Sequence, residues 1–217
     1  MDLDALSQMV VAGDHIGAEQ WTVDALAESV EPRAIIDGAL IPGMDEVGRR
    51  FKGGVYHLPE VLIAARAMKS SLKLVRPLLA EADGPRIGRV VIGTVQGDLH
   101  DIGKNLVSMM LEGAGFEVLD LGVDVSPEAF VEAAENEETR LVCLSTLLTT
   151  TMPKIAETVA ALDAAELRSG LKVMVGGAPV DQAFTDQISA DGYATDAPAA
   201  VELAKTLLGV GGEQGAA

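Results

Sequence analysis

The strongest constraint on the fold is an alternation, in the second part of the chain, of short apolar runs with segments of helical periodicity. The apolar runs cover residues 90–94, 116–119, 141–145, 173–175 and, more weakly, 193–194. The helical segments cover residues 102–114, 127–134, 153–164, 181–188 and 197–208. This alternation is typical of βα units, in which helices connect parallel strands. Five such units predict an α/β fold with an open, doubly wound, five-stranded parallel sheet.

The first part of the chain has a different pattern, because its apolar residues recur at helical spacing from residue 3 to residue 79. One helix face is formed by Leu58, Val61, Leu62, Ala65, Met68 and Leu72. Pro59 suits the first turn of that helix, and Pro42 with Gly43 must kink or interrupt an earlier one. We therefore expect an N-terminal helical bundle, in which Met44, Val61 and Met68 are core residues.

The polar, turn-rich stretch 81–85 divides these two patterns and is the expected linker. The domain boundaries that follow are 1–85 for the helical domain and 86–217 for the α/β domain. Residues 209–217 have no apolar face, so we expect a disordered tail there.

Composition narrows the classes of partner. With 33 acidic and 16 basic residues the net charge is −17, which repels nucleic acid and anionic membrane surfaces. No apolar run is long enough to span a membrane, and the N-terminus lacks a secretion signal, which predicts a cytoplasmic protein. The single cysteine, Cys143, lies in an apolar run and is expected to be a buried structural thiol.

Three strands end in segments that carry polar residues or glycines. The first expected strand leads into Gly97–Asn105, the third ends in Ser145, Thr146 and Leu147, and the fourth runs into Gly176 and Gly177. In a sheet of order 2-1-3-4-5 these three strands are neighbours. Ligands of such sheets bind beyond the carboxyl ends of the strands, where the strand order reverses, so a ligand site is expected at this edge.

The residue types at this edge favour metal ligation. His100 lies in the loop before a helix, where its imidazole can bind a metal, and Asp98 can accept a hydrogen bond from the other ring nitrogen. Ser145 can donate to Asp98 or bind a ligand between strands one and three. The absence of side chains at Gly176 and Gly177 lets a bulky ligand approach the backbone.

Each of these features has an ordinary structural interpretation, and only their coincidence at one sheet edge favours a site. A zinc site is a poor alternative, because His15, His57, His100 and Cys143 are scattered along the chain. A dinucleotide site is also poor, since the first strand is not followed by a Gly-x-Gly-x-x-Gly turn.

The motif Asp98-x-His100-x-x-Gly103, followed by Ser145-x-Leu147 and then Gly176-Gly177, resembles the cobalamin-binding signature of methionine synthase, the mutases and the methyltransferase corrinoid proteins. The resemblance implies a flavodoxin-like or Rossmann-like cobalamin-binding domain. It implies that His100 replaces dimethylbenzimidazole as the lower cobalt ligand, with Asp98 and Ser145 in a hydrogen-bonded relay beneath it. The implied cofactor contacts are Gly97, Asp98, Leu99, His100, Asp101, Ile102, Gly103, Ser145, Leu147, Thr149, Gly176 and Gly177.

The helical part resembles the cap domain of methionine synthase and of the stand-alone corrinoid proteins, in the stretches 43–51 and 58–68. Three residues between helical segments are expected to cover the upper face of the corrin: Tyr56, His57 and Leu58. The chain has no catalytic barrel beside these two parts and is therefore similar to the stand-alone methyl carriers.

Such a carrier is one component of a multi-protein methyltransferase system of one-carbon metabolism. The resemblance implies that cobalt cycles between Co(I) and methyl-Co(III). The implied partners are a substrate:corrinoid methyltransferase, a methylcorrinoid:acceptor methyltransferase that uses tetrahydrofolate or coenzyme M, and a reductive activase.

Two other classes stay open from the sequence. One is the cobalamin-binding subunit of an adenosylcobalamin mutase, which shares the lower-ligand motif but is disfavoured by the cap. The other is a cobalamin storage or sensor protein; a sensor acting on DNA is disfavoured because no basic recognition helix is evident.

Overall fold

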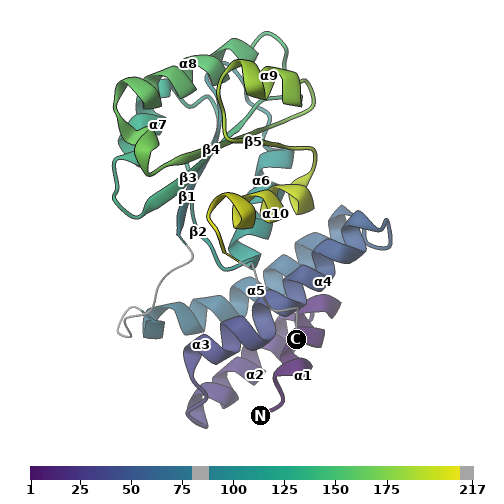
Figure 1. Cartoon of the computed structure of the whole chain (residues 1–217). Coiled ribbons are helices and arrows are strands. Elements are labelled where there is room, and N and C mark those ends of the chain that lie inside the picture. The colour runs from purple at the N-terminus through teal and green to yellow at the C-terminus, as the bar shows by residue number, and fades with distance from the viewer. Residues whose placement is uncertain (80–87, 211–217) are drawn as a thin grey trace, which may run out of the picture. The chain divides into compact units, whose positions relative to one another are not determined.

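The computed structural model describes residues 1–79 and 88–210, apart from the side chains of Arg76 and Leu79. The chain forms two compact units, one built mainly of the N-terminal helices and the other around a sheet (Figure 1). The expected linker 81–85, the expected boundary after residue 85 and tail residues 211–217 lie outside the described residues.

The helices of the helical unit pack around a core of buried apolar side chains, as the sequence periodicity predicts. Its elements are α1 (Leu3–Ala12), α2 (His15–Ala27), α3 (Pro32–Ile35), the π-helical turn η1 (Ile36–Leu40), α4 (Ile41–Lys52) and α5 (Leu58–Leu79). Asp2 and Asp14 cap α1 and α2, since each carboxylate accepts a hydrogen bond from a first-turn amide. Met44, Val61 and Met68 are buried, which confirms them as core residues.

The expected interruption near Pro42 is present as a change of helix type. The turn η1 is π-helical and leads directly into α4, where Pro42 occupies the first turn. Proline has no amide hydrogen and its ring clashes with the carbonyl four residues earlier, so a regular α-helix cannot continue through it. The wider π turn accommodates this position without ending the helical path.

The second unit has the predicted parallel sheet. Its elements are β1 (Arg89–Thr94), α6 (Ile102–Gly113), β2 (Glu117–Asp120), α7 (Pro127–Ala134), β3 (Thr139–Ser145), α8 (Met152–Ala164), the 3₁₀ turn η2 (Leu167–Ser169), β4 (Lys172–Gly176), α9 (Gln182–Gln187), β5 (Gly192–Ala194) and α10 (Ala197–Leu207). The strand order is β2-β1-β3-β4-β5 and every pair is parallel, which confirms the expected order.

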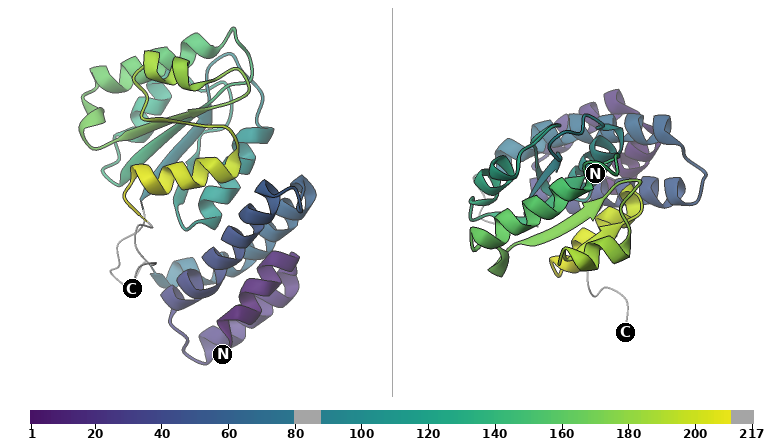
Figure 2. Two further views of the ribbon diagram at one scale, coloured as in Figure 1. Left: turned by 45° about the vertical axis from the view of Figure 1, so that its right-hand side comes forward. Right: turned by 90° about the horizontal axis from the view of Figure 1, so that it is seen from above.

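Helices cover both faces of this sheet (Figure 2). Helices α7, α8 and α9 pack on one face, over a core that includes Val91, Phe130 and Ile155, while α6 and α10 lie on the other. The central strands are buried on both sides, as expected for a doubly wound sheet. Cys143 is buried in β3, and this burial raises the pKa of its thiol.

Among the described residues, no helix has the length and apolar character needed to cross a membrane.

Candidate functional site

The three segments singled out in the sequence lie at the carboxyl edge of the sheet. Thr94, the last residue of β1, pairs in register with Ser145 at the end of β3, and Ser145 pairs with Gly176 at the end of β4. Strand order reverses between β1 and β3, because β2 lies on the other side of β1. The loops after β1 and β3 therefore meet at the point where ligands of such sheets bind.

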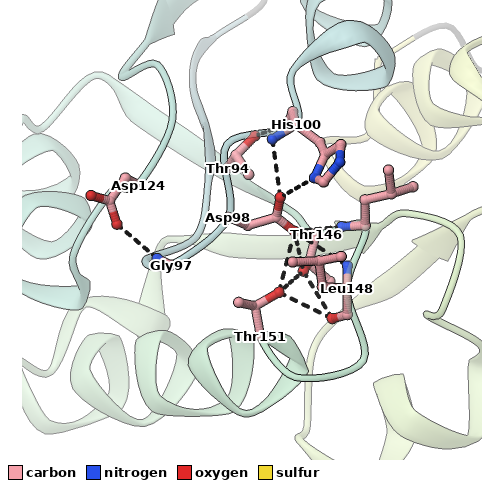
Figure 3. A network of polar contacts seen from close by, with 9 residues as sticks. Thr94, Gly97, Asp98, His100, Asp124, Thr146, Leu148 and Thr151 are labelled. Atoms are coloured by element: carbon pink, nitrogen blue, oxygen red, sulfur yellow. Dashed lines mark hydrogen bonds and ion pairs between the residues drawn. The ribbon is translucent and has the colours of Figure 1, made fainter.

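The loop after β1 presents an imidazole that is tied from below by a buried carboxylate (Figure 3). Nδ1 of His100 lies 2.7 Å from Oδ1 of Asp98, and the backbone amide of His100 donates to the same oxygen at 3.0 Å. The Asp98 side chain is 0% exposed, whereas that of His100 is 51% exposed. Because a carboxylate only accepts, Nδ1 of the neutral ring carries the hydrogen and Nε2 keeps its lone pair.

The second carboxylate oxygen of Asp98 is held by the loop after β3. Oδ2 accepts hydrogen bonds from the amides of Leu147 and Leu148, at 2.7 and 3.3 Å, and from the hydroxyls of Thr146 and Thr151, at 2.8 and 3.2 Å. Ser145 is not among the hydrogen-bond donors to Asp98 in the part of the chain that the structure describes. The expected hydroxyl beneath Asp98 is present, but it comes from the threonines and not from Ser145.

These donors determine the charge state of Asp98. Burial alone raises the pKa of the carboxyl group, because it removes water from the charged form. The hydrogen bonds from the amides of His100 and Leu147, from the His100 ring and from Thr146 outweigh burial and hold the pKa well below its usual range. Asp98 is therefore ionised beneath the imidazole.

The loop that carries His100 is itself fixed at several points. Gly97 has a φ of 86°, and its amide donates to Oδ1 of Asp124 at 2.7 Å. The amide of Asp124 donates to the carbonyl of Asp98 at 3.0 Å, and the Thr94 hydroxyl donates to the carbonyl of His100 at 2.8 Å. The imidazole is thus presented from a loop whose backbone is bonded on both sides.

The structure gives a different reason for glycine at position 177 from the one expected. A Cβ at Gly177 would lie 1.8 Å from the carbonyl oxygen of Thr146, and its φ is 125°. The close neighbour is therefore the backbone of the β3 loop, so the chain itself requires glycine here. Gly176 is half-buried, and a Cβ there would lie 3.3 Å from the Ala194 carbonyl.

The surface beside His100 is apolar and exposed, which fits one face of a flat macrocycle. Leu99 and Ile102 are 72% and 73% exposed, and Leu147 and Leu148 are also exposed. A Cβ at Gly103 would meet nothing within 4 Å, so space is open above the start of α6. Among the described residues, no group of three or more His, Cys, Asp or Glu side chains is placed so that it could hold a metal ion.

The other expected contacts have mixed surroundings. Thr149 is exposed, and so is Asp101, which accepts a hydrogen bond from the side chain of Asn105 at 3.0 Å.

In the helical unit, Leu58 is half-buried, and the Tyr56 hydroxyl donates to the Val11 carbonyl at 3.1 Å. Arg50 lies over the Tyr56 ring, 5.2 Å from its centre. Tyr56 thus has internal partners that the sequence did not reveal.

Comparisons with known proteins agree with this geometry. A family model described as a B12 binding domain matches residues 88–202, and a second model with the same description matches residues 2–76. The chain is 40% identical over 210 residues to a corrinoid protein of Desulfitobacterium hafniense, with 95% of this chain and 97% of that relative covered. It is 44% identical over 198 residues to the dimethylamine corrinoid protein of Methanosarcina barkeri, with 89% and 93% covered.

A solved structure gives the same result. The chain resembles one in the methanol:cobalamin methyltransferase complex of Methanosarcina barkeri, with a TM-score of 0.80 and 29% identity. The match covers 94% of this chain and 78% of that one. The similarity therefore includes both units of the fold.

Proposed function

We propose that this chain, which belongs to the family of cobalamin-binding corrinoid proteins of methyltransferase systems, carries a methyl group on cobalt between two partner enzymes. Its cofactor is a cobalamin or a related corrinoid. The observation that carries the proposal is the half-exposed imidazole of His100, held by the buried carboxylate of Asp98 at 2.7 Å. When bound, the cofactor would supply the chemistry, through a cobalt that would cycle between Co(I) and methyl-Co(III).

The residues of this chain bind and orient that cofactor. His100 would bind the cobalt through Nε2, and Asp98, which accepts from Nδ1, would fix the tautomer of the ring and increase its basicity. The exposed side chains of Leu99 and Ile102 would pack against the corrin and keep water from it. Ser145, half-buried at the end of β3, and Gly176 would line the site of the nucleotide tail.

The upper face and the partners complete the proposal. We assign cover of the methyl-bearing face to the segment around Tyr56 and Leu58, where Val55 is strongly exposed.

The proposed partners are a substrate:corrinoid methyltransferase, a methylcorrinoid:acceptor methyltransferase that uses tetrahydrofolate or coenzyme M, and a reductive activase. Methylated amines and methanol are the first donors to test, because related proteins are a dimethylamine corrinoid protein and part of a methanol:cobalamin methyltransferase complex.

Cofactor uptake by histidine variants tests the ligand assignment. Parent, His100→Ala and His57→Ala proteins are reconstituted with cobalamin and freed of excess cofactor by gel filtration. His57 is an exposed histidine of the helical unit and provides the matched control. We expect the parent and His57→Ala to show the same histidine-ligated visible spectrum, and His100→Ala to lose it. Equal spectra for all three proteins would contradict the assignment.

Methyl transfer tests the carrier role. The reduced parent protein is mixed with dimethylamine or methanol and the corresponding methyltransferase, and the upper ligand is identified by mass spectrometry. We expect methylation of the cofactor that depends on the partner enzyme. An adenosyl upper ligand on protein isolated from cells, together with no methylation by any such partner, would instead support the mutase alternative.

A further inference from the structure

A lysine that is almost fully buried lies four residues after His100. Lys104 is the third residue of α6, and its side chain is 2% exposed. Its Nζ contacts Oδ2 of Asp120 and lies 2.7 Å from Oδ1 of Asn105. Lysine is rarely buried without a partner, because removing an ammonium group from water is costly. The ammonium group of Lys104 therefore depends on these two partners in place of water.

The partner carboxylate belongs to a neighbouring strand. Asp120 is the last residue of β2, where it pairs in register with Ile92 of β1. Its Oδ1 accepts a hydrogen bond from the amide of Gly122 at 2.9 Å, while Oδ2 faces Lys104. The ion pair thus joins the first turn of α6 directly to the end of β2.

The loop that presents His100 is consequently held at both of its ends by carboxylates from β2 and the turn after it. At the start of the loop, the Gly97 amide donates to Asp124. At its end, Lys104 binds Asp120. A segment that is held at both ends has fewer conformations to lose when it binds a ligand.

Stability alone is a poor explanation for this buried ion pair. Burying two opposite charges costs desolvation energy that their attraction only partly repays, so an apolar pair of similar size is often as stable. Separating the two charges is costly, however, because each is then left without its partner. At this place in the fold, the geometry that keeps Lys104 and Asp120 together is also the geometry of the loop around His100.

We propose that Lys104 is a positioning residue for the cofactor loop, residues 97–104. Its ion pair with Asp120 holds the start of α6 in the conformation that presents His100, before a cofactor arrives. The inference rests on the proposed function, because the loop is preformed for a corrinoid. A site that is correctly formed for only a fraction of the time has its apparent affinity reduced by that fraction.

The unequal exposure of the two charges predicts unequal effects of removing them. Asp120→Asn keeps an acceptor for the Gly122 amide, but it leaves a buried ammonium group that reaches water only if the start of α6 moves. Lys104→Met leaves a carboxylate that is already 33% exposed and that water can stabilise. The double variant has neither charge, so it should resemble Lys104→Met.

Hydrogen exchange of the full-length protein without cofactor provides the first test. We expect peptides from residues 97–108 to exchange about tenfold faster in Asp120→Asn, and less fast than that in Lys104→Met and the double variant. Peptides from β3 and β4 should accelerate far less, which separates a local opening from loss of the fold. Lys154→Met is the matched control, because Lys154 is also the third residue of its helix, α8, and pairs with the exposed Glu157.

Cofactor affinity provides the second test. Titration with cobalamin, followed by the histidine-ligated visible spectrum, gives the dissociation constant of each variant. A loop that is correctly formed about one tenth of the time raises this constant about tenfold, which is the change expected for Asp120→Asn. Lys104→Met and the double variant should bind about threefold more weakly than the parent, and Lys154→Met should bind equally well.

Parent exchange and parent affinity in Asp120→Asn would overturn the inference, as would a double variant that binds less well than Asp120→Asn. Should Asp120→Asn fail to fold, Lys104→Met is compared with Lys154→Met, and equal exchange and affinity in these two would overturn it. A parent protein that takes up cobalamin without a histidine ligand, or takes up none, would instead overturn the proposed function. The exchange test needs no cofactor, so the two failures are distinguishable.

Discussion

Two carboxylates with low exposure lie at opposite ends of the sheet, and they are satisfied in different ways. Asp98, at the carboxyl end, is 0% exposed and bonds to hydroxyls, backbone amides and the His100 ring. Asp191, at the amino end, is 16% exposed and bonds to the cations of Arg168 and Lys172, at 2.8 and 3.0 Å. It also accepts from the Val173 amide at 2.8 Å.

The difference separates a carboxylate with a structural role from the carboxylate that we propose to support the cobalt ligand. The charge of Asp191 is neutralised by two cations, so its electric field is weak at more distant groups. Its hydrogen bond from the Val173 amide fixes the start of β4. The charge of Asp98 is stabilised by dipoles and directed at one imidazole, which makes that imidazole a better metal ligand. This placement agrees with the rule that ligands bind at the carboxyl ends of parallel strands.

The largest expected effect is that of Asp98→Asn on the stability of the α/β unit. Both oxygens of Asp98 face donors, so an amide nitrogen in either position would leave buried donors unsatisfied. We expect a loss of about 3–5 kcal/mol in the free energy of unfolding, since each unsatisfied buried donor costs about 1–3 kcal/mol, measured by hydrogen exchange of peptides from β1 and β3. Asp124→Asn is the control, because Asn also accepts at Oδ1 and tolerates the φ of 55°. If Asp98→Asn left the free energy of unfolding almost unchanged, Asp98 and Asp191 would not differ in the way proposed.

Gly177→Ala is next in size and acts on the loop that holds Asp98. The added Cβ meets the Thr146 carbonyl, and alanine is strained at a φ of 125°. We expect a loss of about 2–3 kcal/mol, seen as faster hydrogen exchange in β3 and β4. Gly103→Ala is the matched control, since its Cβ meets nothing within 4 Å and alanine favours the helix α6. Equal effects of the two variants would contradict the close approach.

Asp191→Asn should cost less, about 1 kcal/mol, because Lys172 is 46% exposed and can turn to solvent. Part of this cost comes from charge attraction near the surface, so it should shrink between about 0.1 M and 1 M salt. The cost of Asp98→Asn should not change with salt, because the carboxylate is 0% exposed and most of its donors are uncharged amides and hydroxyls. Hydrogen exchange at both salt concentrations measures the contrast, and identical salt dependence would count against it.

The smallest effect concerns Glu46, a half-buried carboxylate of the helical unit. Hydrogen bonds from Arg49 and Arg50 lower the pKa of Glu46 from 4.5 to about 2. A lowered pKa adds stability above pH 4.5 that is lost as the pH falls toward 2. Glu46→Gln should therefore lower the melting temperature slightly at pH 7, and the gap should close in acid. Fluorescence of Trp21, the single tryptophan, follows this unit; a gap that widens in acid would contradict the sign.

The sheet and its ligand edge were predictable from the sequence because they depend on local patterns. Apolar runs separated by helical segments indicate βα units, and the connections of such units restrict the strand order. The pair of Asp98 and His100 was predictable as well, since residues two apart in a short loop can bond to each other. The same is true of the buried Met44, Val61 and Met68, which follow helical spacing.

The choice between Ser145 and Thr146 was not predictable from the sequence. Successive side chains of an extended chain point in opposite directions, so a shift of one residue reverses which hydroxyl meets Asp98. Thr151 depends on how the loop after β3 folds back, and no periodic pattern encodes that. The run of threonines from Thr149 to Thr151 was the available signal, but composition does not tell which of them turns inward.

The axial nitrogen of cobalt provides the most direct test of the account. The parent protein is loaded with cobalamin, reduced to Co(II) and measured by electron paramagnetic resonance after growth with either ordinary or ¹⁵N-labelled histidine. We predict that the nitrogen splittings change from triplets to doublets on labelling, and that His100→Ala abolishes the change. Triplets that persist with labelled histidine would show that the cofactor's own base still binds the metal, and would contradict the assignment of His100.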